Sequence, residues 1–244
     1  MKKEHVFSTI GLLLLWQIAA MILHNDILIP YPLDTMNRVA SFFVDGSFYQ
    51  SVGSTLLRVL KGYLLSLLIA LFMVILTERF ITVKRLFSPI QLITKTIPNI
   101  SYMVIALIWL GNEGAVSAVS FMILFPVFYN AFANTLDQQG RSLNEVELLY
   151  PETFWMRLRF KVLPQLVPEV LKTGKTAAGL GLKVGIMAEI LGQVRSGIGR
   201  RMNYARLYLD TTSIFAWTII IILLSLILDV LFDRMYQQFL KHES

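Results

Sequence analysis

Long apolar runs are the feature that most limits how this chain can fold. A helix needs about 20 apolar residues to cross the hydrocarbon core of a bilayer, and the 244-residue sequence contains six runs near that length. They lie at 6–23, 53–77, 88–110, 115–135, 169–192 and 213–235. The runs predict an all-α polytopic membrane protein with six transmembrane helices, in which residues 1–244 form one transmembrane domain.

Composition supports a membrane protein and argues against several kinds of site. Charged residues make up 16% of the chain, against about 25% in a typical soluble domain. The chain has no Cys, and its three His lie near the chain ends and in a loop, so we expect neither a metal site nor a cofactor. The net charge of +6 is typical of cationic cytoplasmic loops, and we expect no nucleic-acid partner.

The distribution of Lys and Arg predicts the orientation in the membrane. If the N-terminus is inside, the inner segments 1–5, 78–87, 136–175 and 234–244 hold thirteen Lys and Arg, and the outer segments hold five. Cytoplasmic loops carry an excess of these residues. Both termini and the polar segment 137–168 are therefore expected in the cytoplasm.

The segment 137–168 is too polar to lie in lipid, yet it is patterned. Three of its apolar side chains share one helix face at spacing i, i+4, i+8: Phe154, Leu158 and Val162. Pro151 suits a first helical position, whereas Pro164 and Pro168 are expected to stop the helix. The pattern predicts two short helices with a bend between them. An ordinary amphipathic loop on the membrane surface is the alternative.

The run 169–192 differs from the other five. It contains five glycines, which allow close helix approach. Two of its ionisable residues, Lys183 and Glu189, lie at membrane depth or near its outer edge. Ionisable groups at membrane depth often line a polar route. Alternatively, both lie near an interface and snorkel to water. The two residues are six positions apart, so they do not share a helix face.

Arginines after this run depart from the expected charge distribution. Arg195, Arg200, Arg201 and Arg206 all fall in a predicted outer loop. They are either simply solvated, or they form an electropositive outer mouth for an anion or an acidic partner.

One short stretch matches only the end of a phosphate-binding loop motif. Gly174-Lys175-Thr176 resembles the end of such a loop, but the motif also needs a glycine at position 169, where this chain has Glu169. We therefore expect no nucleotide site and no enzymatic activity in this chain. No Ser–His–Asp set can be assembled either.

Residues along nearly the whole chain resemble the permease subunit of a type I ABC importer, and most closely the nitrate/sulfonate/taurine group of binding-protein-dependent permeases. The most specific of them are Glu145, Trp155, Phe160, Leu163-Pro164, Pro168, Gly174 and Ala188-Glu189-Ile190-Leu191-Gly192. Weaker agreement covers Arg58 to Tyr63, Ile97-Pro98, Trp109 to Gly111, Ser196 to Gly199, Asp210-Thr211 and Phe215-Ala216.

The resemblance implies that the polar segment holds coupling helices that dock on an ATPase subunit. In that family the segment starts with Glu-Ala-Ala, continues to a Gly and ends in Leu-Pro. Here Glu145 matches the acid, Glu147 replaces an alanine, and Pro151 stands where Gly is usual. The implied coupling residues are Glu145, Glu147, Pro151, Trp155, Phe160, Leu163 and Pro164.

The resemblance also implies alternating access in a bacterial cytoplasmic membrane. Two copies of the permease would line the path, with ATP-binding cassette ATPases below and a substrate-binding protein delivering the solute near 24–50 and 193–212. The implied path or gate residues are Lys183, Gly185, Glu189 and Gly192, and the outer mouth holds Arg195, Arg200 and Arg201. Membrane lipid surrounds the assembly.

Two other kinds of membrane protein are alternatives, and within the same family the solute is open. A secondary transporter driven by an ion gradient would show repeated halves and several embedded acids, but no convincing repeat exists and Glu189 is the one good candidate acid. A membrane enzyme would need a reactive constellation, which the chain does not offer. Within the same family, the solute is either a small sulfonate-like anion or a vitamin precursor or other small aromatic.

Overall fold

The computed structural model describes residues 2–149 and 153–243, with side chains except at 2–6, 9, 92, 95, 138–149, 240, 242 and 243. All regular elements in this part of the chain are helical, which confirms the predicted all-α class. They are α1 (Lys2–Leu23), α2 (Pro32–Phe42), α3 (Gly46–Arg79), α4 (Ile81–Thr96), α5 (Asn99–Leu149), α6 (Phe154–Arg157), η1 (Leu158–Val162), α7 (Leu163–Gly192), α8 (Ile198–Leu207) and α9 (Thr211–Glu243).

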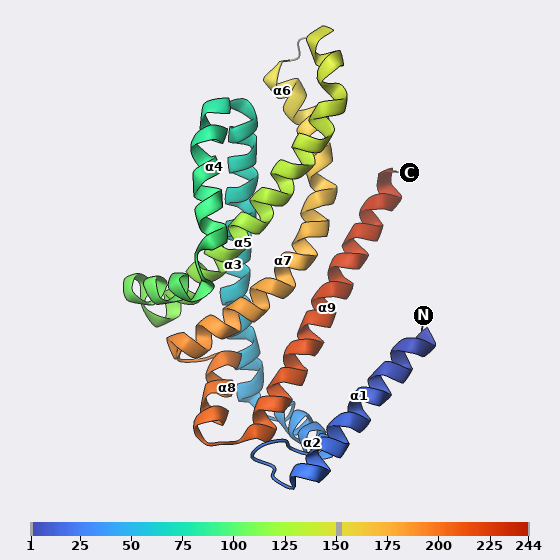
Figure 1. Cartoon of the computed structure of the whole chain (residues 1–244), viewed down its shortest axis with the longest axis vertical. Helices are drawn as coiled ribbons and strands as arrows, with labels where there is room; N and C mark the ends of the chain where they lie inside the picture. The colour runs from blue at the N-terminus through green and yellow to red at the C-terminus, as the bar shows by residue number, and fades with distance from the viewer. Residues whose placement is uncertain (1, 150–152, 244) are drawn as a thin grey trace.

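The long helices run along one axis and separate the loops into two groups (Figure 1). α5 packs against both α3 and α7, and α9 packs against the other side of α7. One end of the molecule holds the turn between α3 and α4, the end of α5 and the start of α6 (Figure 1). α9 ends on the same side. α2 and α8 lie at the opposite end.

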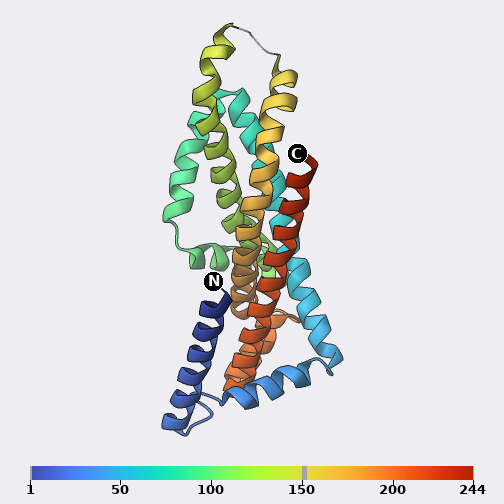
Figure 2. The ribbon, with the colours of Figure 1, turned by 90° about the vertical axis from the view of Figure 1, so that its right-hand side faces the viewer.

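α1 leans away from the other long helices (Figure 2). It is attached near its second half, where the Trp16 Nε1 donates to the carbonyl oxygen of Pro30 at 2.9 Å and the indole lies 5.5 Å from the Phe215 ring. Most of its Leu and Ile side chains are exposed. Much of the apolar surface of α1 is therefore uncovered within one copy of the chain.

Not every predicted span corresponds to a helix that is long and apolar enough to cross a membrane. Three stretches in the described residues are long and apolar enough to cross a membrane: Gly46–Arg79, Asn99–Asp137 and Thr211–Phe239. α1 adds a shorter apolar stretch, Ile10–Leu23. α7 is 30 residues long, but five charged residues and five glycines between 169 and 192 make it less apolar than these three.

The region 88–110, predicted as one span, is divided between two helices. α4 ends at Thr96, and Ile97 is extended with φ −72° and ψ 127°. Pro98 disfavours helical conformation in the residue before it, which explains the break. α5 then starts at Asn99 and kinks at Gly111, where φ is 67°. This kink lies in the gap between the predicted spans 88–110 and 115–135.

Small residues set the close approach of α3, α5 and α7. A Cβ added to Gly62 of α3 would lie 2.6 Å from the backbone oxygen of Ser117 in α5. A Cβ on Gly181 of α7 would lie 3.0 Å from a methyl group of Leu124. Such contacts bring the helix backbones together, as small residues do in membrane helix pairs.

We expect Gly62→Ala to destabilise the protein and Gly53→Ala, in the same helix, to leave it unchanged or more stable. The first substitution forces a methyl group against a backbone oxygen, which costs about 1–3 kcal/mol. The second meets nothing within 4 Å and should gain up to about 1 kcal/mol, because Gly is a poor helix former. Thermal unfolding of the two purified variants in detergent measures the difference, and equal midpoints would contradict the packing described.

Candidate functional site

From Thr153 onward, the polar segment is a continuous, mostly exposed helical path into α7. Thr153 precedes a single turn of α6, and η1 follows as a π turn in which the Leu163 N–H bonds to the carbonyl of Leu158. Pro164 comes next, and in a normal α-helix its ring would clash with the carbonyl four residues earlier. The wider π turn relieves that clash.

The prediction that Pro164 and Pro168 stop the helix is wrong. Pro164 lies in the first turn of α7, where a missing N–H leaves no bond unmade, and Pro168 lies inside the helix. The polar segment therefore joins α7 without a loop. A displacement of α6 can be carried directly into the membrane helix.

Large apolar side chains project from this segment into solvent. Trp155 is 73% exposed and Phe160 is 71% exposed, and Leu163 and Pro164 are also exposed. Val162 is buried in the core between α3, α5 and α7 and anchors the segment. The predicted coupling residues Glu145, Glu147 and Pro151 lie outside the described side chains. Exposed aromatic surface of this kind marks a contact site.

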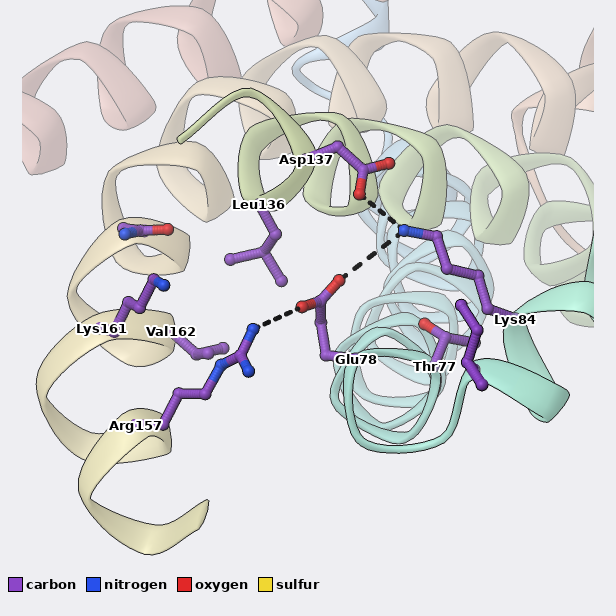
Figure 3. A pocket seen from close by; sticks show the side chains of 10 residues that line it. Thr77, Glu78, Lys84, Leu136, Asp137, Arg157, Lys161 and Val162 are labelled. Carbon is purple, nitrogen blue, oxygen red and sulfur yellow. Dashed lines mark hydrogen bonds and ion pairs between the residues drawn. The ribbon is translucent and has the colours of Figure 1, made fainter. Parts of the chain in front are cut away.

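A charged cleft of about 400 Å³ lies behind the segment. Charged side chains of alternating sign follow one another across it, from Arg157 through Glu78 and Lys84 to Asp137 (Figure 3). Arg157 Nη2 of α6 lies 3.6 Å from Glu78 Oε2 of α3. Glu78 Oε1 lies 3.9 Å from Lys84 Nζ of α4, and Lys84 donates to Asp137 Oδ1 of α5 at 2.6 Å.

Sequence reasoning missed Glu78, Lys84 and Asp137 as site residues. Each stands at the end of an apolar run, where charges usually mark nothing more than the membrane boundary. Burial alone would lower the pKa of the Lys84 ammonium, but the hydrogen bond and charge of Asp137 outweigh it and raise that pKa. Lys84 therefore stays charged through the physiological range.

α7 presents two different faces. Gly185, Glu189 and Gly192 are buried against α3 and α5, whereas Lys183 is exposed. No other described residue forms a hydrogen bond or ion pair with Lys183. Its neighbours on the same face are Thr176 and Met187, which are also exposed. The separation of Lys183 from Glu189 agrees with their spacing of six residues.

Glu189 is the centre of a buried polar network near the end of α7. Its side chain is 0% exposed and accepts hydrogen bonds from Thr55 at 2.8 Å, from Arg58 at 2.7 Å and from the Gly199 N–H at 2.9 Å. Arg58 also donates to the Ser196 carbonyl at 2.7 Å and to Glu113. Burial of a carboxylate is costly unless it is paired in this way.

Two glycines make room for the Glu189 carboxylate. Gly197 has φ +141°, and a Cβ there would lie 2.5 Å from Glu189 Oε2. A Cβ on Gly199 would lie 2.6 Å from the Ile186 carbonyl oxygen. The sequence Ser196-Gly197-Ile198-Gly199 therefore lets the loop after α7 close directly over the acid.

The arginines of the predicted outer mouth form hydrogen bonds with neighbouring residues at this end. The Arg195 N–H donates to Glu113 at 2.7 Å, Arg200 donates to the Tyr204 hydroxyl at 2.9 Å, and Arg201 donates to the Ser51 hydroxyl at 3.2 Å. The Arg195 side chain is exposed, and those of Arg200 and Arg201 are partly exposed. They brace the end of the bundle and still leave positive charge at its surface.

A second ion pair closes the same end between α2 and α9. Arg38 lies 3.1 Å from Asp210, which also accepts hydrogen bonds from Ser213 in the first turn of α9. Burial raises the pKa of Asp210, but these hydrogen bonds and the Arg38 charge outweigh it and hold that pKa below its usual value. Asp210 therefore remains an ionised cap at the start of α9.

These sites are suited to binding and to transmitting movement. The described residues contain no group of three His, Cys, Asp or Glu placed to hold a metal ion. They contain an exposed aromatic end, a charged cleft behind it and a helix with an uncovered, partly polar face. These features can contact another protein, transmit its motion and contact a solute.

We expect Glu189→Ala to be far more damaging than Glu113→Gln, although both acids contact Arg58. Removing the buried partner leaves Arg58 without its interior countercharge, which costs about 3–5 kcal/mol. Glu113 is 45% exposed, and losing an exposed partner costs at most about 1 kcal/mol. Thermal unfolding in detergent checks this order, and similar losses in both variants would show that Glu189 is not central.

Curated proteins with similar sequences are transport permeases. The chain is 22% identical over 225 residues to the taurine transport system permease protein TauC of Escherichia coli, covering 88% of this chain and 80% of that protein. It is 21% identical over 215 residues to the putative aliphatic sulfonates transport permease protein SsuC of Bacillus subtilis, covering 87% and 77%. It is 22% identical over 218 residues to the formylaminopyrimidine transport permease protein ThiX of Halalkalibacterium halodurans, covering 88% and 86%.

A family model covers the same part of the molecule. Residues 62–241, from the middle of α3 to the last turn of α9, match the model described as binding-protein-dependent transport system inner membrane component. The match includes α7, its glycines and the charged cleft. This chain therefore belongs to the family of inner membrane components of binding-protein-dependent transport systems.

Proposed function

We propose that this chain is the permease subunit of an ATP-driven ABC importer and takes its driving motion from a separate ATPase through α6 and η1. The observation that carries the proposal is the exposed aromatic end, which is anchored by Val162 and continuous with α7. Exposed aromatic side chains such as Trp155 and Phe160, at a polar end of a membrane protein, indicate a surface that a partner covers. The predicted coupling residues Glu145, Glu147, Pro151, Leu163 and Pro164 would complete that contact.

We expect Trp155→Ala and Phe160→Ala to weaken the complex with the ATPase. Buried aromatic anchors dominate protein interfaces, and each loss should lower affinity by at least about tenfold. Phe72→Ala is the matched control, because Phe72 is 64% exposed on α3, away from the segment. The measurement is the amount of ATPase that copurifies with the tagged permease from membranes.

A normal complex in both aromatic variants would contradict the docking proposal. Glu145→Arg provides an independent test from the other part of the segment: it should also reduce copurification while membrane insertion stays intact.

The uncovered face of α7 is proposed as one wall of the solute path. Lys183 lies nine residues before the end of α7, which is about 13 Å along the helix. A lysine at such depth is costly against lipid, so a water-filled path is its natural environment. The opposite face of α7 carries Gly185, Glu189 and Gly192, which pack against α3 and α5. Their packing fixes which face of α7 is turned to the path.

One copy of the chain supplies one wall, and we propose a homodimer in which a second copy supplies the other. An extracytoplasmic binding protein would dock at the end formed by residues 24–50 and 193–212, where Arg195, Arg200 and Arg201 provide positive charge. The proposed location is the bacterial cytoplasmic membrane, with both termini in the cytoplasm.

A small sulfonate-like anion is the solute favoured by Lys183 and by the positive outer end. Two of the relatives named above are permeases for taurine and for aliphatic sulfonates, which carry the same anionic group. The formylaminopyrimidine permease supports a small aromatic vitamin precursor as the second candidate. Uptake that needs ATP hydrolysis separates both from an ion-gradient-driven transporter.

We expect Lys183→Met to lower uptake of a labelled alkanesulfonate by roughly tenfold, the effect of losing about 1.4 kcal/mol of interaction with the anion in the path. Lys61→Met is the matched control. Lys61 is also exposed, but its neighbours Leu57, Leu64 and Leu65 form an apolar face of α3 that suits lipid.

Uptake is measured with permease, ATPase and binding protein reconstituted in proteoliposomes. Equal uptake in the two lysine variants would remove Lys183 from the path. Uptake of labelled formylaminopyrimidine in place of the sulfonate, unaffected by Lys183→Met, would favour the second solute.

A further inference from the structure

The contact between the α6–η1 segment and the end of α3 is loosely packed. Clefts of about 400 Å³ and 250 Å³ open beside it, and both are lined by Glu78, Arg157 and Val162. Close-packed protein interiors leave few voids larger than a water molecule. Arg157 can therefore shift against Glu78 while Val162 stays packed in the core.

Glu78 bridges this seam with two long ion pairs. Its carboxylate lies 3.6 Å from Arg157 and 3.9 Å from Lys84, beyond the 2.7–3.2 Å range of a normal hydrogen bond. Lys84 and Asp137 are already in direct contact at 2.6 Å. The adjustable contacts in this chain of charges are therefore those that Glu78 makes (Figure 3).

We propose that Glu78 is the positioning residue that receives the movement of α6 through Arg157 and passes it to α4 and α5 through Lys84. The inference rests on the proposed docking of α6 and η1 on an ATPase. Glu78 is also rigidly joined to the opposite end of the molecule, because α3 is one helix of 34 residues that carries Arg58 as well. The two residues are about 30 Å apart along that helix.

This arrangement makes Glu78 a relay in both directions. Docking of the binding protein near Arg58 would displace α3, and Glu78 would carry the displacement to Arg157 and the ATPase. Stimulation of ATP hydrolysis by the binding protein therefore measures the relay and does not depend on knowing the solute.

The experiment compares Glu78→Gln, Arg157→Gln and the double variant in the complete transporter in nanodiscs. We expect each single variant to lower the stimulation of ATP hydrolysis by purified binding protein by about fivefold. The amount of ATPase in the complex is measured alongside, and it should stay unchanged in Glu78→Gln, because Glu78 lies in α3, outside the proposed docking segment. The double variant should be no worse than Glu78→Gln, because that variant already removes the pair with Arg157.

Asp233→Asn is the matched control. It removes the ion pair between Asp233 of α9 and Lys175 of α7, which at 2.8 Å is closer than the Glu78 pairs, and it should leave stimulation at the wild-type value. Normal stimulation in Glu78→Gln, or a double variant whose loss is the product of the single losses, would overturn the proposal.

Two further comparisons separate loss of the relay from loss of the protein or of the complex. If Glu78→Gln does not accumulate, Arg157→Gln and Arg157→Lys test the pair from α6: loss in the first with retention in the second supports the relay, and no difference overturns it. A wild-type chain that fails to bind an ATPase would remove the proposed function itself. An intact complex with unchanged stimulation in the Glu78 variant would remove this inference alone.

Discussion

The buried carboxylate of Glu189 is the constraint on which the rest of the structure depends. A charge in the interior must be given a complete set of partners, and here they come from Thr55 and Arg58 of α3 and from the Gly199 N–H of α8. Meeting this requirement fixes the rotation of α7 and the position of the loop that follows it. It also fixes which face of α7 remains uncovered, so the exposure of Lys183 follows from the burial of Glu189.

The two ends of the molecule are built differently. At the end near α8, a central arginine is shared among Glu189, Glu113 and the Ser196 carbonyl, and glycines allow the backbone to close over the acid. At the end near α6, charges face one another across open clefts. Strong, saturated contacts at one end and loose contacts at the other allow movement to enter at the loose end and travel through rigid helices.

The sequence predicted the helical class, because this class depends on local hydrophobicity and spacing. It also separated Lys183 from Glu189 by helix geometry. It did not predict the partners of Glu189, since Thr55, Arg58 and Glu113 meet it only after α3, α5 and α7 have packed together. The error at Pro164 arose because a proline that usually ends a helix can also stand in the first turn of the next one.

The π turn of η1 adds a consequence for how this segment tolerates change. A turn that closes one residue later than an α-turn sets the angle between Trp155, which precedes it, and α7, which follows it. A single-residue deletion within 158–162 would swing α6 around the helix axis by about 100°, the rotation of one helical residue, while the packing of α7 stayed as it is. The length of this short stretch therefore sets the direction in which Trp155 projects from the end of α7.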